Sequence, residues 1–159
     1  MSEHNQLILW RHAEAEDGIP GKIDDSDRAL TSHGHKQAAR MAKWLHERLP
    51  KDCRVLVSPA RRTLQTAAAL NREFEIVPAV GLTASPHGLL EAAGWPKTPG
   101  ITIVIGHQPT LGQVVARLLS GSKDMDWSLK KGAIVWLAGR LRDGQHEAVL
   151  RAAMTPEMI

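Results

Sequence analysis

Leu7-Ile8-Leu9-Trp10-Arg11-His12 is the most informative stretch of the chain. Four apolar residues end at a cation and an imidazole, which is typical of a buried parallel strand that carries polar side chains at its carboxyl end. Two further apolar runs have the same form, 55–57 before Ser58-Pro59 and 101–105 before Gly106-His107. These patterns predict buried parallel strands over 7–10, 55–57 and 101–105.

A helical pattern follows each predicted strand. The first has apolar residues at helical spacing behind Thr31, its expected N-cap, and these are Ala38, Met41, Ala42, Leu45 and Leu49. The others cover 63–72 and 111–119, and Gly121 closes the second of them. Strand and helix therefore alternate along the chain.

This alternation predicts an α/β fold, a three-layer sandwich with a mainly parallel central sheet flanked by helices. Further strands are expected over 133–137 and 146–152, joined by an Asp143-Gly144 turn. In sheets of this kind ligands bind beyond the carboxyl ends of the strands. We therefore expect the site at the edge that carries Arg11-His12, Ser58 and His107.

Composition favours one globular domain over residues 1–159, with 43% hydrophobic and 23% charged residues. Cys53 is the only cysteine, so no internal disulfide can form, which favours a reducing compartment. The apolar run 7–10 is too short to span a membrane, and we expect a cytoplasmic protein without a membrane partner. Basic residues are scattered and aromatic residues are few, which disfavours a nucleic-acid partner.

Arginine and histidine side chains follow all three of the predicted strands. Arg11 and Arg62 offer planar, permanently charged guanidinium groups that match phosphate oxygens. A neutral imidazole is a competent nucleophile near pH 7, and we predict that His12 attacks phosphorus while His107 bonds the transferred oxygens. Phosphoryl transfer needs mainly positioning and charge neutralisation, so we expect no metal and no cofactor.

Four sequence motifs follow one another along the chain. They are Leu9-Trp10-Arg11-His12-Ala13-Glu14, Leu30-Thr31-x-x-Gly34-x-x-Gln37-Ala38, Ser58-Pro59-Ala60-Arg61-Arg62-Thr63-x-Gln65-Thr66-Ala67 and Ile105-Gly106-His107-Gln108-Pro109. Together they resemble the histidine phosphatase superfamily, whose fold is that of the phosphoglycerate mutases. The small size of the chain further resembles the SixA-type phosphohistidine phosphatases.

The resemblance implies that His12 is phosphorylated, that Arg11 and Arg62 bind the phosphoryl group and that His107 completes the pocket. Arg28 stands where SixA-type proteins carry a phosphate-facing arginine, so it is a further candidate phosphate ligand. The family pattern selects Arg62 over Arg61, which is kept as the fallback. The implied partner is a phosphorylated protein, for which a histidine phosphotransfer domain is one candidate. The oligomeric state is left open.

Two positions depart from the superfamily pattern. Ala13 replaces the usual Gly, which we interpret as tolerated because Ala has the smallest side chain after Gly. The stretch 77–86 contains no acid where the superfamily usually supplies a proton donor, and Glu91 comes only later. A general acid is worth about 10²–10⁴-fold in rate when the leaving group needs a proton. The imidazole of phosphohistidine can already carry a proton near neutral pH, so it leaves without a general acid. The absence of an acid from 77–86 therefore favours an N-phosphorylated substrate.

Two other functions are compatible with these residues. One is a small-molecule phosphomonoesterase in which Glu91 or Glu14 acts as the proton donor. The other is a module that binds a phosphorylated ligand through the arginines without turnover. A pure binder has no chemical need for His12, which favours an enzyme.

Overall fold

The computed structural model describes residues 5–159, and its centre is a sheet with the strand order β3-β2-β4-β1-β5-β6. The strands are β1 (Asn5–Arg11), β2 (Arg54–Val57), β3 (Glu75–Ile76), β4 (Gly100–Gly106), β5 (Ile134–Arg142) and β6 (Gln145–Met154). Strands β3, β2, β4 and β1 are parallel, whereas β5 and β6 continue the sheet in antiparallel pairs. The predicted mainly parallel sheet is confirmed.

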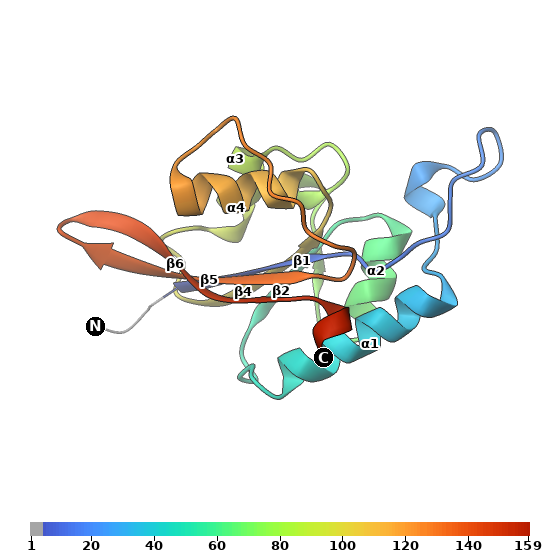
Figure 1. Ribbon diagram of the computed structural model, residues 1–159, viewed down its shortest axis with the longest axis horizontal. Coiled ribbons are helices and arrows are strands. Elements are labelled where there is room, and N and C mark those ends of the chain that lie inside the picture. Colours follow the sequence, from blue (N-terminus) through green and yellow to red (C-terminus); the bar gives the residue numbers. More distant parts are fainter. Residues whose placement is uncertain (1–4) are drawn as a thin grey trace.

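Helices cover both faces of this sheet (Figure 1). They are α1 (Ser32–His46), α2 (Arg61–Ala68), α3 (Pro86–Ala93) and α4 (Thr110–Ser120), with the short 3-10 turns η1 (Asp25–Asp27), η2 (Pro78–Val80) and η3 (Pro156–Met158). In Figure 1, α3 and α4 lie above the sheet and α1 lies below it, and α2 belongs to the same hydrophobic cluster as α1. The predicted three-layer sandwich is therefore confirmed.

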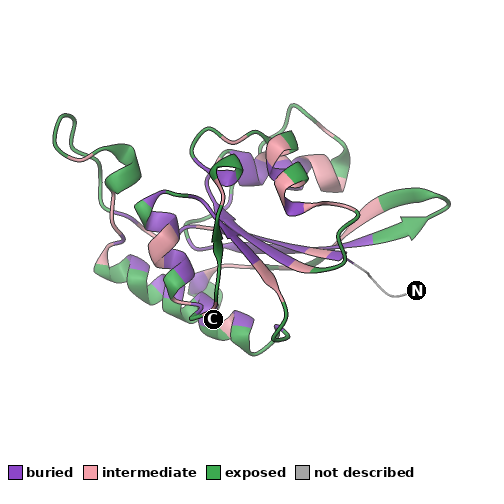
Figure 2. Cartoon of the chain, turned by 180° about the vertical axis from the view of Figure 1, so that it is seen from behind, coloured by how far each residue is buried: buried purple, intermediate pink, exposed green. Residues whose placement is uncertain are grey.

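The alternation of side chains along β1 explains the two layers. Leu7 and Leu9 are fully buried in a cluster with residues of α3 and α4, whereas Ile8 and Trp10 are fully buried against α1 and α2. Successive strand residues point to opposite faces, so one apolar run serves both cores. Figure 2 shows the result as a continuous band of buried residues along the sheet.

The first predicted helix has the expected cap and buried face. The Thr31 side chain accepts a hydrogen bond from the backbone N–H of Gly34, and Met41 and Leu45 are fully buried. The helix predicted over 63–72 instead begins at Arg61 and ends at Ala68. Beyond it, Asn71 adopts a left-handed backbone (φ 51°), a conformation that stops a helix and that asparagine tolerates.

The strands at the carboxyl end of the chain are longer than predicted. Asp143 and Gly144 both have positive φ, which is the backbone of a tight two-residue hairpin turn. Strand β3 was not predicted, because it has only two residues and both are exposed. Within residues 5–159 no helix is both long and apolar enough to cross a membrane.

A long segment between β1 and α1 extends beyond the sheet, and we call residues 16–29 the projecting loop (Figure 1). An antiparallel bridge between Ala15 and Leu30 closes its base, and a second bridge joins Ile19 to Ile23. Most of its residues are exposed (Figure 2). Its turn η1 contacts α2, so this loop returns to the edge of the sheet where the predicted site lies.

Gly34 is required by a close approach of two backbones, and this gives a stability prediction. A Cβ at this position would lie 2.0 Å from the carbonyl oxygen of Glu14. Gly→Ala normally stabilises a helix by about 1 kcal/mol, but here we expect Gly34→Ala to destabilise the protein by about 1–3 kcal/mol because the chain after His12 must move. Urea unfolding measures the difference, and His35→Ala on the exposed face of α1 is the control. An equal or higher stability of Gly34→Ala would contradict the packing described.

Candidate active site

Strand register brings three functional segments to one edge of the sheet. Arg11 pairs with Gly106 in the β1–β4 ladder, and Val57 pairs with Ile105 in the β2–β4 ladder. The residues that follow are therefore neighbours, and the backbone N–H groups of His12 and Ser58 both donate to carbonyl groups of β4, at 3.2 and 3.1 Å. The predicted convergence of strand ends is present in the structure.

The orientation of the His12 ring is set by its own backbone. Its Nδ1 lies 2.8 Å from the carbonyl oxygen of Ala13. A carbonyl can only accept, so Nδ1 carries the proton of the neutral ring and Nε2 keeps its lone pair. This Nε2 accepts a hydrogen bond from Arg62 Nε at 3.3 Å. His12 is thus buried, with its basic nitrogen directed at a guanidinium group.

Arg62 is the arginine that reaches this histidine. It is buried on the first turn of α2 with 4% of its surface exposed, whereas Arg61 is exposed. A buried guanidinium needs partners for its N–H groups. Besides His12, Arg62 donates through Nη1 to the backbone oxygen of Asp25 (2.6 Å) and through Nη2 to Asp25 Oδ2 (3.1 Å). The structure therefore places Arg62, and not the fallback Arg61, beside His12.

His107 lies beside His12, and its partner was not foreseen from the sequence. The two ring centroids are 5.4 Å apart, with the ring planes at 54°. A hydrogen bond of 2.7 Å joins His107 Nε2 to Ser58 Oγ, and both residues are buried. The other ring nitrogen, Nδ1, is buried and has no hydrogen-bond partner among residues 5–159. Ser58 was recognised only as part of a motif, because a serine at a strand end has many local backbone partners.

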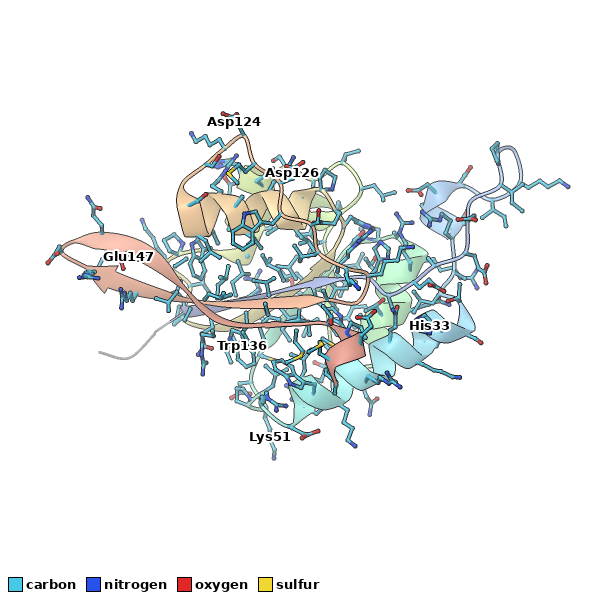
Figure 3. The ribbon with its side chains drawn as sticks, viewed as in Figure 1. His33, Lys51, Asp124, Asp126, Trp136 and Glu147 are labelled. Atoms are coloured by element: carbon cyan, nitrogen blue, oxygen red, sulfur yellow. The ribbon has the colours of Figure 1, made fainter. Side chains whose placement is uncertain are left out.

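Arg11 is half-buried and is held by the loop that follows α4. Its Nη1 donates to the carbonyl oxygen of Leu129 at 2.6 Å, and its Nε is buried without a partner within the described part of the chain. Figure 3 labels Asp124 and Asp126 on the same loop. The loop is fixed by Gln108, whose side-chain amide donates to Trp127 O at 2.7 Å. Arg11 and His107 thus both present an unsatisfied nitrogen.

Arg28 lies on the projecting loop, and Asp25 joins it to the other site residues. The Arg28 guanidinium donates to Glu16 O (2.7 Å) and to Asp25 Oδ1 (2.9 Å). Asp25 also accepts from Arg62, so one carboxylate connects two of the predicted phosphate ligands. Sequence reasoning missed Asp25 because three aspartates precede Arg28 and nothing in the pattern distinguishes them.

The electrostatics of the site disfavour further positive charge. Burial is the main cause that lowers the pKa of His12 to about 3, and Arg62, His107 and Arg11 lower it further. The hydrogen bond to the carbonyl oxygen of Ala13 acts in the opposite direction and raises this pKa. Burial and Arg62 lower the pKa of His107 to about 4. Burial and Arg62 also lower the pKa of Arg11. Both imidazoles are therefore neutral at pH 7, beside the positive charges of Arg11 and Arg62.

The two candidate proton donors lie in different surroundings. Glu91 is on α3, where its exposed carboxylate lies 3.4 Å from His87 Nε2. Glu14 accepts a hydrogen bond from the hydroxyl of Thr31 at 2.8 Å, which ties it to the start of α1. Among residues 5–159 no group of three or more His, Cys, Asp or Glu side chains could hold a metal ion. Metal independence stays a prediction.

Comparison with known families and curated proteins gives a consistent result. Residues 7–84 match the model of the histidine phosphatase superfamily (branch 1). An uncharacterised protein of Picosynechococcus is 31% identical over 139 residues, which cover 83% of this chain and 84% of that protein. Human 6-phosphofructo-2-kinase/fructose-2,6-bisphosphatase 3 is 39% identical over 69 residues, and this match spans only 13% of its length.

Solved structures resemble almost the whole chain. A protein histidine phosphatase SixA complexed with tungstate superposes with a TM-score of 0.75 and 25% identity, over 96% of this chain and 98% of the other. A candidate SixA from Nakamurella multipartitia gives a TM-score of 0.78 and 25% identity, over 98% of both chains. A phosphoserine phosphatase from Entamoeba histolytica, at 17% identity and a TM-score of 0.69, shares the fold.

The lowered pKa values predict how the two imidazoles titrate. Because the pKa of His12 is about 3 and that of His107 about 4, both rings should stay neutral when the pH falls from 8 to about 5.5, where a free imidazole becomes largely protonated. The unfolded chain binds protons at these two imidazoles at about pH 6.5, whereas the folded protein does not. The contribution of the two neutral rings to the free energy of unfolding is therefore complete above the unfolded pKa, and it is lost as the pH falls toward the pKa values of the folded protein. Imidazole NMR titration, with assignments from His12→Asn and His107→Asn, tests this. Protonation of either ring near pH 6.5 would contradict it.

Proposed function

The chain belongs to the histidine phosphatase superfamily, and we propose that this phosphatase hydrolyses phosphohistidine on a protein substrate through a phospho-His12 intermediate. The observation that carries the proposal is the Nε2 atom of His12. It holds a lone pair in a neutral, buried ring, and Arg62 Nε lies 3.3 Å away. A nucleophilic nitrogen beside a phosphate-binding cation is the arrangement that phosphoryl transfer requires.

The reaction balances without a separate proton donor. His12 Nε2 attacks phosphorus, the new N–P bond forms, and the N–P bond of a protonated phosphohistidine breaks to release a neutral imidazole. Water then attacks phospho-His12, the N–P bond breaks, and both protons of the water stay on the dihydrogen phosphate ion. His12 returns to its neutral form. The absence of an acid from the stretch 77–86 therefore costs little for this substrate.

The unsatisfied nitrogens near His12 support an anionic ligand. Arg11 Nε and His107 Nδ1 are buried without partners among residues 5–159, and a buried unpaired donor costs about 1–3 kcal/mol. In the tautomer where Ser58 donates to His107 Nε2, the Nδ1–H group is available to a phosphoryl oxygen. We infer that Arg11, Arg62 and His107 hold the phosphoryl oxygens. Arg28 contributes to the positive field and is bonded to Asp25 rather than directed at His12.

The inferred partner is a phosphorylated protein, and a histidine phosphotransfer domain fits the chemistry. A solved SixA relative was obtained with tungstate, an oxyanion that resembles phosphate in charge and shape. A cytoplasmic location, the absence of metals and a single domain over residues 1–159 are parts of this proposal.

A sugar phosphomonoesterase is the second candidate, and one finding favours it. The human relative that matches over 69 residues carries a fructose-2,6-bisphosphatase activity in its name. This substrate has an alkoxide leaving group, so the proposal then needs a carboxylic acid near the leaving oxygen. Glu91 and Glu14 are the candidates that the sequence suggested, and both are engaged elsewhere in this structure.

Substitution of His12 tests the nucleophile. His12→Ala should abolish turnover of phosphohistidine while tungstate affinity changes by less than about tenfold, because the guanidinium groups remain. Steady-state phosphate release and calorimetric titration with tungstate measure the two quantities. His33→Ala is the matched control, since His33 is an exposed residue on α1 (Figure 3). Turnover that survives in His12→Ala would refute the assignment. Phosphate trapped on the wild-type protein should be stable to base, labile to acid and located on His12.

Substrate choice separates the two candidate reactions. We expect kcat/KM for a phosphohistidine-containing protein to exceed that for a sugar phosphate by at least about 100-fold. This factor is the lower end of the rate enhancement that a general acid supplies when the leaving group needs a proton. Glu91→Gln and Glu14→Gln should leave phosphohistidine turnover within about twofold. A preference for the sugar phosphate, together with loss of activity in one of these variants, would establish the phosphomonoesterase instead.

A further inference from the structure

Asp25 is the one acidic side chain bonded to the candidate site within residues 5–159. Its two carboxylate oxygens accept from two different arginines, Arg28 through Oδ1 and Arg62 through Oδ2. Its backbone oxygen accepts a third bond, from Arg62 Nη1 at 2.6 Å. The Asp25 side chain is 57% exposed and that of Arg62 only 5%, so the carboxylate closes the solvent side of a buried cation.

We propose that Asp25 is a positioning residue that fixes the Arg62 guanidinium with its Nε edge toward the phosphorylated nitrogen of His12. This inference rests on the proposed phosphatase function, because that function makes His12 Nε2 the atom that receives phosphorus. Asp25 acts through Arg62 and does not touch the reacting atoms.

The division of the Arg62 donors carries the inference. A guanidinium has five N–H groups in one plane. The Nη1 and Nη2 groups of Arg62 are bound by the backbone and side chain of Asp25, while Nε points to His12 Nε2 at 3.3 Å. When phosphorus bonds to that nitrogen, the hydrogen bond from Arg62 to His12 Nε2 breaks, and the Nε–H group, which Asp25 holds on the same side, is then available to a phosphoryl oxygen. Without the bonds to Asp25, the Arg62 side chain would populate several rotamers, and the entropy of that freedom would be lost in each turnover.

Charge supports the same role. Burial and the Arg62 charge lower the pKa of Arg11, which shows that the two guanidinium groups repel one another. The hydrogen bond from Arg28, followed by that from Arg62, holds the pKa of Asp25 below its usual range, so the carboxylate is ionised at neutral pH. The Asp25 carboxylate offsets one of the three positive charges of Arg11, Arg28 and Arg62. Two positive charges remain, which matches a doubly charged phosphoryl group.

Asp25→Ala tests the proposal through the separation of kcat from KM. We expect kcat for phosphohistidine to fall by at least about tenfold, because Arg62 loses its charge-assisted bond to the carboxylate and keeps only the bond to the backbone oxygen of residue 25. KM should stay within about threefold, because removal of a negative charge favours the anion while loss of alignment disfavours it. Asp27→Ala in the same turn η1 is the control and should leave both constants unchanged within about twofold, since Asp27 is exposed.

A double substitution shows whether Asp25 acts through Arg62. In an Arg62→Lys background, Asp25→Ala should change kcat by less than about twofold, because lysine has no second edge to fix. An undiminished effect in that background would overturn the proposal. So would an Asp25→Ala protein with an unchanged or raised kcat and a lower KM, because Asp25 would then be a competitor for the phosphoryl position.

The alignment is also measurable without any turnover. In the wild-type protein the Nε–H resonance of Arg62 should be sharp and slow to exchange with water, and in Asp25→Ala it should broaden or be lost, with the Asp27→Ala spectrum as reference. This result is independent of which phosphorylated compound is the substrate. A wild-type protein that leaves phosphohistidine intact would refute the proposed function, while an unaltered Arg62 resonance in Asp25→Ala would refute the positioning role.

Discussion

The candidate site depends on the register between β1, β4 and β2. The β1–β4 and β2–β4 ladders end at the same edge, so His12, Ser58 and His107 leave the sheet as neighbours although they are separated by up to 95 positions in the chain. A shift of one residue in either ladder would turn each side chain to the opposite face of its strand and would separate the imidazoles from one another and from Ser58. The two hydrophobic cores therefore fix the positions of the polar groups as well as the stability of the fold.

Burial and positive charge act together at this edge. The rings of His12 and His107 are almost fully covered, and the adjacent guanidinium groups make a second proton unfavourable on either of them. The free protein thus keeps a basic nitrogen unprotonated within a positive environment, and the same charges attract an anion to it. This combination is costly for the folded state without a ligand, since Arg11 and His107 each leave a buried nitrogen unpaired within the described chain. In the proposed function, the phosphoryl oxygens supply the partners that these two nitrogens lack.

Much of this arrangement could be predicted from the sequence. The apolar runs gave the parallel strands, the helical spacing before Leu45 gave α1 with its cap at Thr31, and polar residues after each strand gave the edge where the site lies. What could not be predicted depends on three-dimensional contacts between distant segments. Asp25 gains its importance from Arg62, 37 positions away, and the bond from Ser58 to His107 spans 49 positions. Propensity and periodicity contain no information on such pairs, and the same limit explains why the two-residue β3 went unseen.

The closed base of the projecting loop has a consequence for how such a protein can diverge. Because the bridge between Ala15 and Leu30 fixes both ends, residues can be inserted or deleted near Ile19 and Ile23 at a small entropic cost and without a shift of β1 or α1. The exposed surface of the tip can then change in length and composition while His12 and Arg62 stay where they are. The projecting loop therefore has two parts: the tip near Ile19 can vary in length, whereas the part that carries Asp25 is tied to Arg62 and cannot vary without a change at the site.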